Sequence, residues 1–180
     1  DFPIYNPTAI CADIEKNIYV VNNLPSYRKI DDDGSFVSQL ILKFNSKGER
    51  LFELGKNGIG TIPFGNILGM ATDEKDNLIV YESSADGPLF YKFTKNGQLE
   101  KRVKITKGDI PLTTKENDYL LEIIDAKIGY FENEIFITCQ YVKEIKDVPS
   151  IVKYECVYEK ILKYSISSQK FERLLLKITP

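Results

Sequence analysis

The sequence predicts an all-β protein whose four-stranded antiparallel sheets are arranged like the blades of a β-propeller, with about three blades visible. The first observation is a repeat: "LILKFNSKGERLFELG" (Leu40–Gly55) recurs as "LFYKFTKNGQLEKRVKI" (Leu89–Ile105) and, less faithfully, as "KILKYSISSQKFERLLLKI" (Lys160–Ile178). The second observation is that a similar shorter segment precedes each copy. The third is the spacing of the copies, roughly 40–60 residues, which is compatible with a four-stranded propeller blade.

Each copy of the repeat is expected to form a β-hairpin. In the first copy, apolar residues alternate with their neighbours over residues 40–45, which is the period of two that a strand produces. Gly48 ends the turn "NSKG", where a glycine adopts a positive φ without steric cost. In the second copy Asn96 and Gly97 lie between two apolar runs, which is the strongest short sequence signal for a hairpin.

The segment that precedes each hairpin is expected to form two further strands around a polar turn. These segments run over Ala9–Asn23, Gly69–Ser83 and Ile123–Gln140. Their second strands are rich in β-branched and aromatic residues and lie at Ile18–Val21, Leu78–Tyr81 and Ile135–Thr138. We therefore expect a single domain over residues 1–180, with blade units over residues 8–56, 67–107 and 120–178. A short helix is the alternative near residues 120–128, where the apolar residues also fit helical spacing.

Long inserts between the second and third strands distinguish the first and third units. They cover Leu24–Gln39 and Tyr141–Glu159, and we expect them to project from one face of the propeller. The second insert also alternates in polarity, so the alternative is that it extends the sheet as a long strand. Tyrosine combines apolar area with a polar tip and favours contact surfaces. The candidate partner-binding residues in and beside the inserts are Tyr27, Arg28, Tyr141, Tyr154 and Tyr158. The alternative is that these side chains pack on their own blade.

The number of units raises the question of closure, because closed propellers typically have about 4–8 blades. Three units alone would have two open flanks with unpaired apolar faces. We expect the chain to be a fragment of a longer propeller. The alternatives are that a homodimer completes a six-bladed ring, or that the sheets form an open arc.

Composition argues against several classes of function. The chain has 180 residues and a net charge of −2, without the basic excess of nucleic-acid-binding proteins, so no nucleic-acid partner is expected. It contains no histidine, the commonest zinc and haem ligand, and no metal site or cofactor is predicted. The cysteines, Cys11, Cys139 and Cys156, are expected to be buried apolar side chains. A Cys139–Cys156 disulfide is the alternative in an exported protein.

Three further patterns fit structural roles better than chemical ones. The "DDDG" of Asp31–Gly34 lacks the ligand spacing of a calcium-binding EF-hand loop and is expected to be a solvated turn. The glycine-rich stretch Gly55–Gly60 lacks the Gly-Lys-Ser/Thr of a phosphate-binding loop and is expected to connect two blades. Asp13, Asp73 and Asp125 occupy similar places in the three units, and this repetition indicates a structural role in turns. No catalytic residue is therefore predicted.

The order of three motifs resembles a known family. The motifs are "ADIEKNIYVV" (Ala12–Val21), "ILKFNSKG" (Ile41–Gly48) and "GKNGIGTIPF" (Gly55–Phe64), and they resemble the NHL-type repeats of six-bladed propellers. More closely, residues 10–107 are similar to a family of spirochaete lipoproteins of uncharacterised function. The resemblance implies export, a lipid anchor upstream of this chain and residence in the cell envelope.

The function expected on this basis is non-catalytic binding or scaffolding of a protein or a glycan through the inserts on one propeller face. The alternative is a propeller hydrolase or lyase with a metal ion held by carboxylates, because histidine ligands are absent from the sequence.

Overall fold

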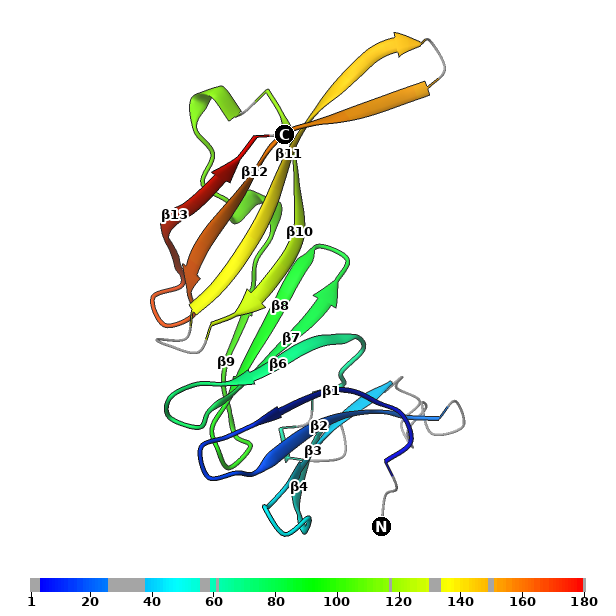
Figure 1. The fold of residues 1–180 in the computed structure, drawn as a ribbon, viewed down its shortest axis with the longest axis vertical. Coiled ribbons are helices and arrows are strands. Elements are labelled where there is room, and N and C mark those ends of the chain that lie inside the picture. Colours follow the sequence, from blue (N-terminus) through cyan, green and yellow to red (C-terminus); the bar gives the residue numbers. More distant parts are fainter. Residues whose placement is uncertain are drawn as a thin grey trace. The chain divides into compact units, whose positions relative to one another are not determined.

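The computed structural model describes residues 4–25, 38–55, 59–60, 62–116, 118–129, 134–148 and 151–179, and Figure 1 shows it as a ribbon. Over these residues the regular structure consists of β-strands and short 3-10 helices, which confirms the predicted all-β class. The chain divides into two compact units, unit 1 over Asp1–Lys104 and unit 2 over Ile105–Pro180. That residues 1–180 form a single domain stays a prediction.

Unit 1 contains two sheets, which correspond to the first two predicted blade units. In blade 1 the strands lie side by side in the order of the sequence: β1 (Pro7–Ala12), β2 (Ile18–Asn23), β3 (Gln39–Phe44), β4 (Arg50–Gly55) and the two-residue β5 (Ile59–Gly60). The first four strands are antiparallel, and β5 pairs in parallel with β4. Blade 2 is antiparallel throughout, with β6 (Ile67–Thr72), β7 (Leu78–Ser84), β8 (Gly87–Phe93) and β9 (Leu99–Lys104).

Unit 2 contains blade 3, an antiparallel sheet of β10 (Leu120–Ile128), β11 (Glu134–Val148), β12 (Ile151–Ser165) and β13 (Lys170–Ile178). The short helices η2 (Lys107–Asp109) and η3 (Thr114–Glu116) precede it. The helix considered near residues 120–128 does not form, because this segment pairs with β11 as a strand. Strands β11 and β12 each have 15 residues, so the second insert extends the sheet, as the alternative interpretation proposed.

The blades share two β-bulges at equivalent positions. In the pairing of the first strand with the second, a bulge follows the fourth residue pair from the turn, between Pro7 and Ala9, Ile67 and Gly69, and Ile123 and Asp125. In the pairing of the third strand with the fourth, a bulge follows the lysine of the third strand, at Lys43/Phe44, Lys92/Phe93 and Lys163/Tyr164. Because a bulge bends its strand and increases the local twist, equivalent bulges shape the blades alike.

The hydrophobic core of unit 1 contains side chains from both of its blades. Blade 1 contributes the fully buried Tyr19 and Ile41, and blade 2 contributes Tyr91 and Phe93. Phe64, from the connector between the blades, is fully buried and lies edge-on to the ring of Tyr91, with 5.6 Å between the ring centroids. Burying an aromatic side chain of this size stabilises the fold by about 1.5–3 kcal/mol. The connector therefore packs into the core through Phe64.

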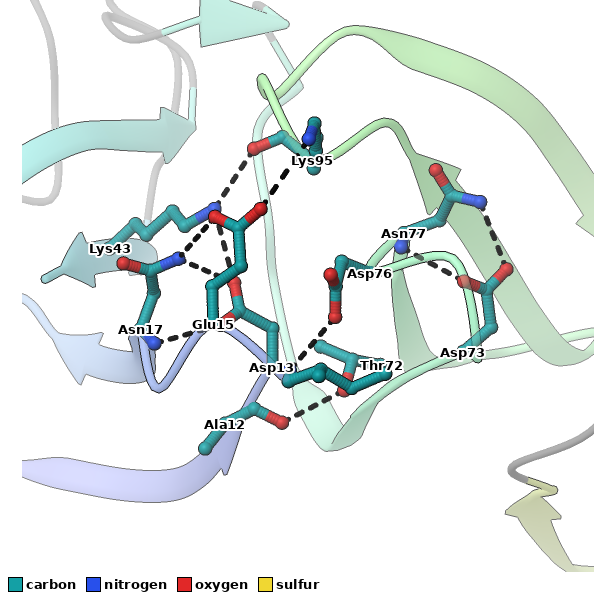
Figure 2. Close-up of polar contacts among 11 residues, drawn as sticks. Ala12, Asp13, Glu15, Asn17, Lys43, Thr72, Asp73, Asp76, Asn77 and Lys95 are labelled. Atoms are coloured by element: carbon teal, nitrogen blue, oxygen red, sulfur yellow. Dashed lines mark hydrogen bonds and ion pairs between the residues drawn. The ribbon is translucent and has the colours of Figure 1, made fainter. Parts of the chain in front are cut away.

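In blades 1 and 2 a lysine lies beside a buried carboxylate at the end where the first and second strands meet. Nζ of Lys43 lies 3.3 Å from Asp13, and both side chains are at most 5% exposed. Nζ of Lys92 lies 3.4 Å from the fully buried carboxylate of Asp73. Lys43 also donates a hydrogen bond to the backbone oxygen of Lys95 in blade 2, at 3.0 Å. Figure 2 shows the blade 1 cluster beside the turn of blade 2.

Two further hydrogen bonds join the turn of blade 1 to the turn of blade 2 (Figure 2). The backbone N–H of Ile14 donates to Oδ1 of Asp76, and the hydroxyl of Thr72 donates to the backbone oxygen of Ala12, both at 2.8 Å. Since strands β1 and β6 also pack against each other, these bonds fix the relative position of the two sheets within unit 1.

Blade 3 has a lysine at the same position as blades 1 and 2, but the carboxylate beside it comes from a different position in the sheet. The strand register places Lys163 at the position of the blade 1 and blade 2 lysines, and Lys163 forms an ion pair with Glu134. The register also shows that Gly129, not Asp125, occupies the place of the turn aspartates. Asp125 lies inside β10, where its carboxylate accepts a hydrogen bond from the next backbone N–H. The expected equivalence of Asp125 with the other two aspartates is therefore wrong.

Replacing the buried lysine tests the importance of this contact. The variant Lys43→Met leaves the buried Asp13 without its cation, so we expect a loss of about 3 kcal/mol in the free energy of unfolding. Urea unfolding followed by circular dichroism measures it. Lys95→Met is the matched control, because its ion pair with Glu15 is more than half exposed and contributes at most about 1 kcal/mol. Equal stability of the two variants would contradict this role for Lys43.

Candidate functional site

The candidate site lies in unit 1, at the end of the blades opposite the lysine–aspartate pairs. There the chain enters blade 1 through a segment held by Asn22, which is 1% exposed. Oδ1 of Asn22 accepts hydrogen bonds from the backbone N–H groups of Tyr5 and Asn6, at 2.8 and 3.4 Å. The backbone N–H of Asn23 in turn donates to the backbone oxygen of Asn6. These contacts fix the entry segment against the end of β2.

Blade 2 repeats this arrangement with a carboxylate. Glu82 stands at the strand position of Asn22, and its Oε1 accepts the backbone N–H groups of Gly65 and Asn66, at 2.6 and 3.2 Å. The backbone N–H of Ser83 donates to the backbone oxygen of Asn66. Oε2 of Glu82 accepts the hydroxyl of Tyr91 at 3.0 Å. By register and by hydrogen bonding, Asn66 is therefore the blade 2 counterpart of Asn6.

The start of β3 joins the two entry regions. The buried side chain of Gln39 donates to Oδ1 of Asn23 at 2.7 Å and accepts the backbone N–H of Ile67 at the start of β6. The preceding Ser38 donates its hydroxyl to backbone oxygens of the connector, including that of Phe64 at 3.2 Å. These bonds tie blade 1 to blade 2. They also hold the side-chain amide of Gln39 in one orientation, because both its nitrogen and its oxygen are bonded.

A polar pocket of about 500 Å³ lies between these elements. Its polar lining consists of Asn6, Asn23, Asn66, Ser38 and Gln39. Its remaining lining residues are Tyr5, Leu24, Pro25 and Gly65. Within the described residues, the lining thus combines amides, a hydroxyl and apolar surface and contains no charged side chain.

The amides of Asn6 and Asn66 are available to a ligand. Neither side chain makes a hydrogen bond to another residue in the part of the chain that the structure describes, whereas Gln39 is engaged at both of its polar atoms. An unpaired amide presents up to two donor hydrogens and an acceptor oxygen. The pocket therefore offers neutral hydrogen-bonding groups from equivalent positions of two successive blades.

The first insert begins and ends at this pocket. Pro25 and Ser38, which both line it, flank residues 26–37 in the chain. Two of the predicted partner-binding residues, Tyr27 and Arg28, belong to that segment and lie outside the described residues. Their role stays a prediction.

The other predicted partner-binding residues lie in unit 2, and the structure separates them. Tyr141 and Tyr158 are 0% and 5% exposed and stack on each other, with 4.6 Å between the ring centroids. They pack locally, as the alternative interpretation proposed. Tyr154 is 57% exposed, on the part of the β11–β12 hairpin that continues beyond the pairing of β10 (Figure 1). Of these three side chains, that of Tyr154 alone presents a large surface to solvent.

A buried cluster of Glu116, Lys160 and Tyr158 packs against the stacked rings of Tyr141 and Tyr158. The carboxylate of Glu116, in η3, forms an ion pair with Lys160 and accepts the hydroxyl of Tyr158 at 2.8 Å and the backbone N–H of Thr113 at 2.8 Å. Burial by itself raises the pKa of Glu116, but the hydrogen bonds from Lys160, Thr113 and Tyr158 outweigh it and lower the pKa to about 2. The cluster anchors the segment that precedes β10 onto the sheet.

The turn carboxylates of unit 1 have structural partners. Both oxygens of Asp13 accept hydrogen bonds from Asn17 at 2.8 Å. Asp73 accepts the equivalent bonds from Asn77. Burial raises the pKa of the Asp73 carboxyl, while the hydrogen bonds and Lys92 lower it, and the balance lies below its usual value. The predicted turn role is thus confirmed for Asp13 and Asp73.

The described residues contain neither a cluster suited to a metal ion nor a reactive thiol pair. Among the described residues, no group of three or more histidine, cysteine, aspartate or glutamate side chains gathers to hold a metal ion. Cys11, Cys139 and Cys156 are free thiols, so the alternative disulfide is not formed. Burial raises the pKa of Cys11 and Cys139 to about 12, which keeps both as unreactive thiols. No helix in the described ranges is long and apolar enough to cross a membrane.

The sequence matches no family model and no curated protein. The pocket was not predicted from the sequence, although a signal exists there. An asparagine stands seven residues before the turn aspartate in both unit 1 blades, at Asn6 and Asn66. Asparagine is common in turns, so the pattern did not indicate a binding site. The two asparagines come to one shared edge only when the two blades pack together.

The Glu116 cluster makes the stability of unit 2 pH-dependent. The pKa of the Glu116 carboxyl is about 2 in the folded chain, below the 4.5 of an ordinary glutamate. The stabilisation of the folded state by this carboxylate is therefore fully present above pH 4.5 and is lost as pH falls towards about 2. We expect the stability difference between wild type and Glu116→Gln to shrink over this range. Urea unfolding at several pH values measures it, with the half-exposed Glu122, as Glu122→Gln, for control. A difference that does not change with pH would contradict the assignment.

Proposed function

We propose that this chain is a non-catalytic binding or scaffolding module of a bacterial lipoprotein in the cell envelope, and that it holds a protein or glycan ligand at the polar pocket of unit 1. The observation that carries the proposal is the pocket itself. Its volume of about 500 Å³ lies within the roughly 300–1,000 Å³ that is usual for ligand sites. Its lining includes two amides without partners among the described residues, which a ligand can use.

The lining is preorganised, which favours binding. Buried side chains hold both entry segments and the start of β3: Asn22 and Gln39 in blade 1, and Glu82 in blade 2. A ligand that enters a preformed site does not bear the entropic cost of ordering its walls. The turn carboxylates at the other end of the blades are engaged by lysine and asparagine, which favours the binding function over metal-assisted hydrolysis.

The cellular part of the proposal rests on the motif resemblance. The similarity of residues 10–107 to the NHL-type lipoproteins supports residence in the cell envelope and a lipid anchor upstream of this chain. Further blades in a longer polypeptide, or a homodimer, would complete a ring of the roughly 4–8 blades that closed propellers have. The slight negative net charge of −2 supports a partner other than a nucleic acid.

Substitution of the two available amides tests the pocket. Labelled wild-type protein is applied to arrays of bacterial surface glycans and of purified envelope proteins, and we expect at least one ligand to bind. The double variant Asn6→Ala/Asn66→Ala removes two ligand hydrogen bonds of about 1 kcal/mol each, so affinity falls at least about tenfold. Gln98→Ala is the control, because it removes an exposed amide in the β8–β9 turn. Undiminished binding by the double variant, or no ligand on either array, would overturn the proposal.

Lipid labelling tests the location. The full polypeptide, expressed in the bacterium that encodes it, is expected to incorporate radiolabelled palmitate and to sediment with the membrane fraction. Serine in place of the candidate acylated cysteine upstream of this chain should remove the label while the protein is still produced. A protein that stays unlabelled in the cytoplasmic fraction would refute the envelope assignment and leave the pocket assay unaffected.

A further inference from the structure

We infer that the pocket of unit 1 binds a short neutral saccharide, held by hydrogen bonds from the side-chain amides of Asn6, Asn23 and Asn66 to ligand hydroxyl groups. This inference rests on the proposed binding function and names the chemical class of its ligand. Three properties of the lining favour such a ligand: its hydrogen-bond donors and acceptors, its charge and its apolar surface.

The hydrogen-bonding groups match hydroxyls. Each hydroxyl donates one hydrogen bond and accepts others, and an amide supplies an acceptor oxygen and donor hydrogens side by side. Asn6 and Asn66 have unused amides within the described residues, and Nδ2 of Asn23 lies beside the oxygen that Gln39 occupies. Adjacent hydroxyls on a sugar ring can therefore bond to one amide through both of its polar atoms.

The charge of the pocket wall disfavours an anion. Glu82, 7% exposed, stands behind the wall and already accepts the backbone N–H groups of Gly65 and Asn66. These N–H groups are therefore not available to a phosphate or carboxylate, and the buried negative charge repels such a ligand. A cation finds no carboxylate oxygen among the described lining residues, because Glu82 stands behind the wall and both of its oxygens already accept hydrogen bonds. The site is therefore suited to an uncharged ligand.

The lining also disfavours a purely apolar ligand. A hydrocarbon would remove the unpaired amides from water without replacing their hydrogen bonds, which costs free energy. The apolar part of the lining comes from Leu24, Pro25 and the ring of Tyr5, which is 37% exposed. A sugar ring has a C–H face for such a surface and hydroxyls at its edge for the amides, so it satisfies both parts of the lining.

Titrations with defined saccharides test the inference. The probes are neutral disaccharides and trisaccharides of glucose, galactose, mannose and N-acetylglucosamine, their uronic-acid counterparts and a set of neutral peptides. Calorimetry measures affinity, and two-dimensional ¹⁵N NMR follows the side-chain amide signals of Asn6, Asn23 and Asn66. We expect a neutral saccharide to bind and shift these signals, and the matching uronic-acid saccharide to bind at least about tenfold more weakly because of the Glu82 charge.

Matched variants locate the contact. Asn66→Ala is expected to lower the affinity about five- to tenfold, the effect of one lost hydrogen bond. Asn66→Asp keeps the side-chain shape, removes the donor hydrogens and adds a charge near Glu82, so it should weaken neutral saccharides further. Gln98→Ala should bind like the wild type. Unchanged NMR spectra of the backbone in each variant confirm that the fold is retained.

The outcomes separate this inference from the function on which it rests. Binding of an arrayed protein or peptide that Asn6→Ala/Asn66→Ala abolishes, with no saccharide binding, overturns the saccharide assignment and keeps the binding module. Saccharide binding that is insensitive to Asn66→Ala and Asn66→Asp, or that shifts no pocket amide, also overturns the assignment. Absence of every ligand on the arrays and in the titrations overturns both.

Discussion

The packing of blade 1 against blade 2 is the constraint on which the rest of unit 1 depends. A four-stranded sheet with a large apolar face must cover that face, and here each sheet covers the other around Tyr19, Phe64 and Tyr91. The same packing brings two entry segments to one edge, where Asn6 and Asn66 line a common pocket. The site is thus a consequence of repetition: equivalent residues of two blades meet only because the sheets stack.

Buried polar contacts fix the alignment of the two packed sheets. An apolar interface alone tolerates sliding, whereas a buried lysine is stable only beside its carboxylate. Lys43 satisfies this requirement within its own blade through Asp13 and across to blade 2 through the backbone oxygen of Lys95. In blade 3, Glu134 supplies the charge that aspartate supplies elsewhere. The lysine thus has an acidic partner in each of the three blades, although the position of that partner differs in blade 3.

Local signals predicted the elements, and long-range pairing decided the rest. The alternation in Leu40–Gly55 and the turn at Asn96-Gly97 depend on neighbouring residues, so the hairpins and the four-stranded blades were predictable. The apolar residues of the segment 120–128 fit the periodicity of a strand and that of a helix, and only the pairing with β11 selects the strand. The equivalence proposed for Asp125 failed because it relied on spacing without register. The pocket could not be predicted, because its members are far apart in sequence.

The two ends of the blades in unit 1 have different chemistry, and this difference explains where a ligand can bind. At the turn end, the carboxylates of Asp13 and Asp73 each form a hydrogen bond with an asparagine and an ion pair with a lysine, so they stabilise the fold. At the opposite end, the backbone is held by Asn22 and Glu82, which leaves the side-chain amides of Asn6 and Asn66 without a hydrogen-bond partner among the described residues. A repeat that satisfies its backbone with buried groups can thus present its remaining amides to a ligand.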